Sequence, residues 1–98
     1  MLHTLHAEIR MAQRGLSDDA LRFVAAYGQI TYRTGVKFIF LGRRDIPRQH
    51  RRSHGHLEGL TLVLNPRTHE VITCYRNREA LSEIRRKAKR AARGERVA

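Results

Sequence analysis

The chain has 98 residues, of which 41% are hydrophobic, and this suits one domain with a modest core. It carries 20 Lys and Arg against nine Asp and Glu, a net charge of +11 that favours a polyanionic partner, with an anionic membrane surface as the weaker alternative. A single cysteine, Cys74, excludes an intrachain disulfide, and no apolar run suits a membrane span or a signal peptide, so we expect a soluble cytoplasmic protein.

Residues 3–14 are expected to form a first helix that ends at Gly15 in a left-handed C-cap. At about 100° per residue, an apolar band of this helix is expected to pack on the domain; it consists of Leu2, Leu5, Ile9, Ala12 and Leu16. A second band directly beside it carries two imidazoles and two guanidiniums, from His3, His6, Arg10 and Arg14. Residues 1–28 have no net charge. The stripe therefore reflects where these side chains are placed along the helix and not a local surplus of basic residues.

Ser17 is expected to cap a second helix that ends at Gly28, which completes a helical hairpin. The hydrophobic period then changes to two, which predicts four strands, at 29–33, 36–41, 57–65 and 70–76. Turn residues at 34–35 connect the first strand to the second, and those at 65–68 connect the third to the fourth. The segment 42–56 is longer than an ordinary loop, which indicates a functional or a mobile loop.

Residues 79–93 are predicted to form a basic C-terminal helix with a thin apolar face. The expected fold is therefore α+β, with an N-terminal helical hairpin, a four-stranded antiparallel sheet covered by helices on one face, and the basic helix. We expect one domain over 1–98, with its core at about 3–80.

The positive charge is concentrated in two segments. Residues 43–52 carry net +4 and residues 76–98 carry net +6, and 17 of the 20 basic residues are Arg. The planar guanidinium binds phosphate in a bidentate manner. Genomic base composition explains the preference for Arg over Lys equally well, but it does not explain the net charge. The residues expected to bind RNA are Arg14, Arg43, Arg44, Arg48, Arg51, Arg52, Arg76, Arg85, Arg86 and Lys89.

His6 and Arg10 are the first candidates for catalysis. RNA is cleaved without a metal when a base deprotonates the 2′-hydroxyl, an acid protonates the 5′-oxygen and cations stabilise the phosphorane. A histidine suits either proton role, and an arginine stabilises the developing charge. The i, i+4 spacing puts both side chains on one helix face. The alternative is an ordinary solvated helix face.

The strand 70–76 offers further candidates. Its alternation puts Thr73 and Tyr75 on one face, together with Val71, and Ile72 and Cys74 on the other, which resembles a core face. Thr73 and Tyr75 are therefore the better ligand candidates, and Arg76 at the strand end could also reach a substrate. Tyr75 could instead be an ordinary half-buried sheet residue.

A metal site is disfavoured. The loop histidines His50, His54 and His56 could bind a transition metal with Cys74 or a carboxylate, but no second cysteine is present and the flanking Arg51 and Arg52 would repel a cation. These histidines are more simply RNA contacts or solvated residues. Cys74 lies mid-strand, away from any helix N-terminus that would lower its pKa, so it is a poor nucleophile. No metal or other cofactor is expected.

One segment carries a family resemblance. The pattern His6-Ala7-x-x-Arg10-Met11-x-x-Arg14-Gly15-Leu16-Ser17 resembles the opening motif of a widespread bacterial family classified only as domain of unknown function 4258. Members of that family are similar to RelE-like toxins of the barnase–EndoU–colicin–RelE superfamily of metal-independent ribonucleases. The segments Gly59-Leu60-x-Leu62-Val63-Leu64-Asn65-Pro66 and Val71–Arg76 resemble its later strands, so the likeness covers about 3–80.

The resemblance implies a RelE/barnase-like sheet with an RNA-cleaving or RNA-binding face, His6 and Arg10 as the active pair, and Thr73, Tyr75 or Arg76 opposite. The leading hypothesis is a small ribonuclease that acts as the toxin of a toxin–antitoxin pair, held by an acidic antitoxin. The second is a non-catalytic module that binds RNA or the ribosome. The weakest is a DNA-binding accessory protein, since helix 79–93 resembles no recognition unit. The sequence does not predict the oligomeric state of the protein.

Overall fold

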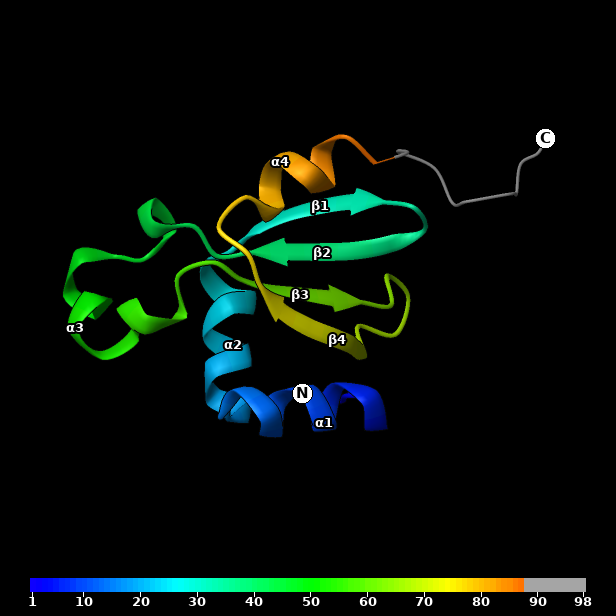
Figure 1. Ribbon diagram of the computed structural model, residues 1–98, viewed down its shortest axis with the longest axis horizontal. Helices are drawn as coiled ribbons and strands as arrows, with labels where there is room; N and C mark the ends of the chain where they lie inside the picture. Colours follow the sequence, from blue (N-terminus) through cyan, green and yellow to red (C-terminus); the bar gives the residue numbers. More distant parts are fainter. Residues whose placement is uncertain (88–98) are drawn as a thin grey trace.

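The computed structural model describes residues 1–87 and has the expected α+β architecture (Figure 1). Two helices, α1 (Leu5–Arg14) and α2 (Asp18–Tyr27), precede a four-stranded antiparallel sheet, and α4 (Ala80–Arg85) follows it. The strands lie side by side in chain order and are β1 (Gln29–Arg33), β2 (Val36–Phe40), β3 (Leu60–Leu64) and β4 (Val71–Arg76).

Polar caps begin both N-terminal helices. The Thr4 hydroxyl accepts a hydrogen bond from the backbone of Ala7 (3.1 Å) and donates one to the carbonyl of Ile72 on β4 (2.9 Å). The Ser17 hydroxyl accepts from the backbone of Ala20, and Gly15 ends α1 with a φ of 64°, as predicted. The caps therefore fix where each helix begins, and Thr4 also ties α1 to the sheet.

The predicted packing face of α1 is wrong. The buried residues of the helix are Ala7 and Met11, whereas Leu2 and Leu5 are each 73% exposed and Ile9 is 49% exposed. The cause lies before the helix, where Leu2 accepts from the Val71 amide and Thr4 donates to the Val71 carbonyl, both at 2.9 Å. These bonds set the rotation of α1 against β4 and leave its apolar band in solvent.

The sheet separates two hydrophobic cores. One core packs α1 and α2 against one face, and its β3 residues are Leu60, Leu62 and Leu64. The other packs Ala80 and Ile84 of α4 against the opposite face. The expectation that the helices cover one face is therefore wrong, and all five residues of β3 are buried because both of its faces are covered.

A register shift changes the faces of β4. Leu64 pairs with Val71, but Val63 pairs with Thr73, so the ladder contains a bulge at this point. As a result Val71 lies in the first core together with Cys74, and Ile72 is only half-buried. The simple alternation predicted for this strand is wrong at its start, while Thr73 and Tyr75 still share a face.

The segment between β2 and β3 is not an irregular loop. It forms four short helical turns, namely η1 (Arg43–Asp45), η2 (Arg48–His50), α3 (Arg51–His54) and η3 (Gly55–Leu57). Phe23 of α2 stacks on His54 with ring centroids 4.1 Å apart, and the Tyr27 hydroxyl lies 3.4 Å from His50 Nε2. Contacts with α2 therefore order this segment, which the length of the loop alone did not indicate.

The C-terminal helix is described only in part. α4 runs from Ala80 to Arg85. Of the predicted helix 79–93, residues 79–87 are described, and within them the helix is shorter than predicted. Lys89 and the rest of that predicted helix, from residue 88 on, lie outside the described residues.

Asp18→Asn is expected to destabilise the domain at neutral pH. The pKa of Asp18 is lowered from 3.8 to about 2, chiefly because Arg22 donates a hydrogen bond to it (2.6 Å), and secondly because the N-terminal ammonium does (2.9 Å). A carboxyl whose pKa is lowered by folding contributes stability above its unfolded pKa and loses it as the pH falls through the folded value. The gap in Tm between wild type and variant should therefore close between about pH 4 and about pH 2.

Asp19→Asn is the matched control, because Asp19 also lies in the first turn of α2 but has no ion pair within residues 1–87. A Tm gap for Asp18→Asn that persists unchanged at pH 2 would contradict this account.

Candidate nucleic-acid interface

α1 carries three of the predicted site residues along the β4 edge of the sheet. His6 and Arg14 are exposed and Arg10 is half-buried, with its Nη1 donating to Gln13 Oε1 (3.2 Å). Burial raises the pKa of the Cys74 thiol on β4, and the charges of Arg14 and Arg10 oppose this rise. Both guanidiniums therefore lie close enough to β4 to act on its central residue.

His3 does not belong to this group. It precedes α1 and forms an isolated bridge with Val71, and its ring faces the carboxylates of Glu8 (3.3 Å) and Asp18 (3.9 Å). The predicted stripe of four side chains is thus reduced to His6, Arg10 and Arg14.

Thr73 and Tyr75 lie on the sheet face that α4 covers. They pair with Val63 and Thr61, and Tyr75 packs against the second core. Burial raises the pKa of Tyr75, and the charge of Glu83 on α4 adds to the rise. Tyr75 is therefore a neighbour of α4, whereas the buried residues of α1 belong to the first core.

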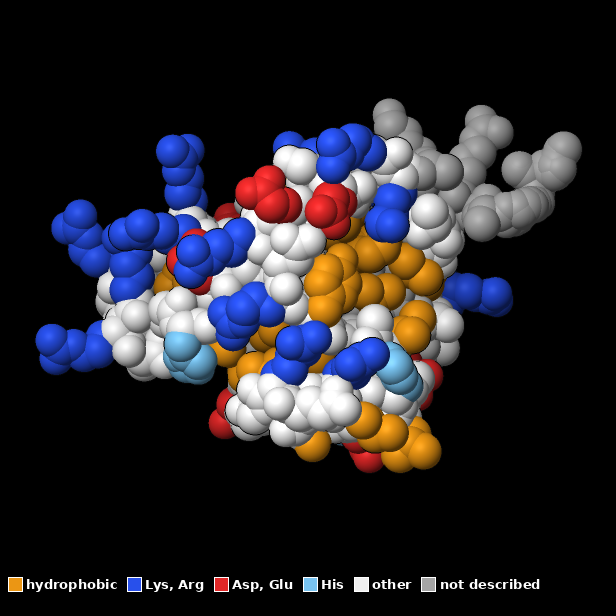
Figure 2. Space-filling model, in the orientation of Figure 1, with side chains coloured by type: hydrophobic (Ala, Val, Ile, Leu, Met, Phe, Trp, Pro, Cys, Tyr) orange, Lys and Arg blue, Asp and Glu red, His pale blue; other side chains and the backbone are white. Residues whose placement is uncertain are grey.

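The two groups border one surface. Figure 2 shows an apolar area over the sheet between α4 and α1, with basic and histidine side chains over α1 at its border. On this face of the sheet, the side chains of Phe38, Val63 and Tyr75 form the apolar layer. Phe38 and Val63 are buried in this layer and Tyr75 is half-buried, so Tyr75 is the aromatic side chain of the three that a base could stack on beside the guanidiniums.

The arginines predicted to bind RNA are not neutralised. Within residues 1–87, none of them forms an ion pair with an acidic side chain; the acidic residues that do form ion pairs there contact Met1, His3, Arg22 and Arg78. All of those described are exposed, and they are Arg14, Arg43, Arg44, Arg48, Arg51, Arg52, Arg76, Arg85 and Arg86. A basic surface whose arginines have no acidic partner among the described residues is suited to bind an external polyanion.

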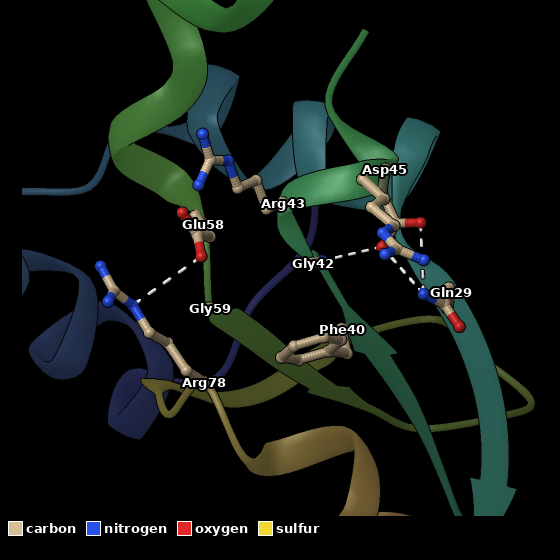
Figure 3. Close-up of a pocket in the computed structure, with 9 residues that line it drawn as sticks. Gln29, Phe40, Gly42, Arg43, Asp45, Glu58, Gly59 and Arg78 are labelled. Atoms are coloured by element: carbon tan, nitrogen blue, oxygen red, sulfur yellow. Dashed lines mark hydrogen bonds and ion pairs between the residues drawn. The ribbon is translucent and has the colours of Figure 1, made fainter.

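A second site lies where β2 ends and β3 begins, and the sequence did not predict it. A cavity of about 260 Å³ opens there (Figure 3), lined by Gln29, Phe40, Gly42, Arg43, Arg44, Asp45, Glu58, Gly59 and Arg78. A neighbouring cavity of about 240 Å³ shares Arg43 and Glu58 with it and adds Ile46, Arg51 and Gly55. A signal was present in the sequence, because a glycine next to a charged residue follows β2 (Gly42-Arg43) and another such pair precedes β3 (Glu58-Gly59).

The part of the chain that the structure describes has no group of three or more His, Cys, Asp or Glu side chains placed to hold a metal ion. His50 and His54 instead lie 5.8 Å apart, centroid to centroid, in the aromatic cluster with Phe23 and Tyr27. No helix within residues 1–87 has the length and apolar character needed to cross a membrane.

Comparison of the chain with known protein families, curated proteins and solved structures gives no match. The motif resemblance to the family of unknown function therefore stays a prediction from the sequence.

Proposed function

We propose that this protein is a small metal-independent ribonuclease that holds RNA on its basic surface. The observation that carries the proposal is the array of exposed arginines that have no acidic partner within residues 1–87, with the exposed His6 beside Arg10 and Arg14 at one border of it. The array supplies affinity for phosphate, and His6 gives α1 an imidazole, the side chain most often used as a general acid or base.

In the proposed reaction, His6 takes the proton of an RNA 2′-hydroxyl or returns one to the leaving 5′-oxygen. The 2′-oxygen attacks phosphorus, the bond from phosphorus to the 5′-oxygen breaks, and the products are a 2′,3′-cyclic phosphate and a 5′-hydroxyl. Arg10 and Arg14 bind the phosphate oxygens as their charge increases. Thr73 and Tyr75, on the adjoining sheet face, orient the scissile phosphate.

The proposal extends to a biological role. A ribonuclease with this charge must be controlled in the cell that makes it, so we propose a toxin acting in the cytoplasm, neutralised by an acidic antitoxin that covers the basic surface. Charge complementarity supports this partner.

His6→Ala is expected to lower the rate of RNA cleavage by about 10²–10⁴-fold, because a positioned proton carrier contributes a factor of this size. The assay follows cleavage of a defined single-stranded RNA by the full chain in EDTA. His56→Ala is the matched control, since His56 is also exposed but lies away from α1, in η3, and this variant should cleave at the wild-type rate. Equal cleavage by wild type and His6→Ala would refute the role of His6.

A non-catalytic RNA-binding module is the second candidate, and the position of Tyr75 favours it. Tyr75 packs beside Glu83 of α4, so the hydroxyl proposed to face the scissile phosphate has a neighbour that is negatively charged. This candidate predicts RNA binding by both wild type and His6→Ala with no cleavage by either.

A further inference from the structure

We infer that the cavity between the ends of β2 and β3 is a nucleotide site selective for guanine. The inference rests on the proposed RNA function but not on its catalytic chemistry, and it assigns a role to residues outside the α1 site. The floor of the cavity is the Phe40 ring, and the side chains of Arg43, Glu58 and Arg78 stand around it (Figure 3).

Two glycines keep the cavity open. A Cβ on Gly42 would lie 3.1 Å from Cε2 of Phe40 and 3.2 Å from Oδ2 of Asp45, so its absence leaves space next to the ring. Gly59 has a φ of +85°, and a Cβ there would lie 3.3 Å from Cγ of Arg78. The volume of about 260 Å³ is slightly below the range of ligand pockets for drug-sized molecules, which leaves room for the base of a nucleotide while its phosphate lies at the opening.

The two carboxylates of the cavity differ in how many hydrogen bonds they can still accept from a ligand. Asp45 is occupied, because its oxygens accept from Gln29 Nε2 (3.1 and 3.2 Å) and from the Gly42 amide (2.8 Å). Within residues 1–87, Glu58 has one long ion pair, from Oε2 to Arg78 Nε at 3.8 Å. Glu58 therefore has both carboxylate oxygens available to accept hydrogen bonds from a ligand.

The backbone that carries Glu58 is held from three sides. Arg76 Nη1 donates to the Glu58 carbonyl (2.7 Å), the Gly59 amide donates to the Leu41 carbonyl (2.7 Å), and the Asn77 amide donates to the Gly59 carbonyl (2.9 Å). The backbone at Glu58 is thus held in place, which lowers the backbone entropy lost when a ligand binds.

The chemistry of the lining selects the ligand. Arg43 and Arg44 have no acidic partner within residues 1–87 and can bind a phosphate. An ionised carboxylate only accepts hydrogen bonds, so the base must offer donors. Guanine presents two adjacent donors, N1–H and the N2 amino group, which match the two oxygens of Glu58. Adenine and cytosine offer an amino group beside a ring acceptor, and uracil offers one N–H between two carbonyls.

The second cavity gives this site a direction. It shares Arg43 and Glu58 with the first and adds Arg51, so a strand that places guanine over Phe40 can continue past Arg43 toward Arg51. The cluster 43–52, which is net +4, is then the path of the flanking phosphates.

The test is calorimetric titration of the full chain with the 5′-monophosphates of guanosine, adenosine, cytidine and uridine, and with inorganic phosphate. None of these contains an internucleotide bond, so the result is independent of whether the protein cleaves RNA. Guanosine monophosphate is expected to bind about 5–100-fold more tightly than the other nucleotides, the range of one good bidentate contact. Glu58→Gln should abolish this preference and leave the affinity for phosphate unchanged.

Two further variants separate base from phosphate recognition. Arg43→Gln should weaken the binding of all four nucleotides by a similar factor. Glu79→Gln, an exposed acidic residue outside the cavity, should bind like wild type. Equal affinity for the four nucleotides, or phosphate binding as tight as guanosine monophosphate binding, would overturn the inference, as would a guanine preference that Glu58→Gln retains.

Discussion

The affinity of this protein for single-stranded RNA is expected to fall by about 10²–10⁴-fold when the salt concentration rises from about 50 to about 200 mM. This range applies to proteins that make about 6–10 phosphate contacts. The structure offers exposed arginines in this number, and no carboxylate of residues 1–87 competes for them. Fluorescence anisotropy of a labelled RNA at five or six salt concentrations measures the slope.

Paired and unpaired arginines provide the control for this prediction. Arg22 bonds to Asp18 at 2.6 Å, so Arg22→Gln should leave the salt slope unchanged. Arg51→Gln should lower the slope by about one phosphate contact, because Arg51 lies on the basic segment and has no acidic partner within residues 1–87. An affinity that does not depend on salt, or equal slopes for both variants, would contradict the assignment of this surface to RNA.

Leu62→Ala is expected to lower the free energy of unfolding by about 2–5 kcal/mol. Leu62 is fully buried in the middle of β3, where it pairs with Ile39 on one side and Cys74 on the other. Its removal leaves a cavity in the first core that the sheet cannot fill without moving α1 or α2. Denaturant unfolding monitored by circular dichroism measures the loss.

Leu5→Ala is the matched control and also tests the rotation of α1. Leu5 belongs to the band that the sequence predicted to pack, yet it is 73% exposed in the structure. Its replacement should change stability by less than about 0.5 kcal/mol. If Leu5→Ala cost as much as Leu62→Ala, the predicted packing face would be right and the observed rotation wrong.

Local signals explain the elements that the sequence predicted well. Ser17, Gly15 and the period-two pattern of β3 act over a few residues, and each appears in the structure close to its predicted place. The features that the sequence did not predict depend on distant partners. The rotation of α1 is set by Val71, and the short helical turns within 48–54 pack on Phe23 of α2.

The candidate sites divide in the same way. The surplus of arginine is a property of composition, so the basic surface was predictable. The guanine cavity was not, because its lining comes from four separate parts of the chain, at 29, 40–45, 58–59 and 78. The strand order brings the end of β2 beside the start of β3, and only then do Gly42 and Glu58 face one space.

The central claim is that His6 cleaves RNA without a metal, and the ends of the RNA products test it most directly. Wild-type protein incubated with a defined RNA in EDTA should yield 2′,3′-cyclic phosphate and 5′-hydroxyl ends, and a single 2′-deoxy substitution at the cleaved position should block that cut. His6→Ala should yield almost none of these products. Products with 3′-hydroxyl and 5′-phosphate ends, or no cleavage by the wild-type protein, would contradict the account.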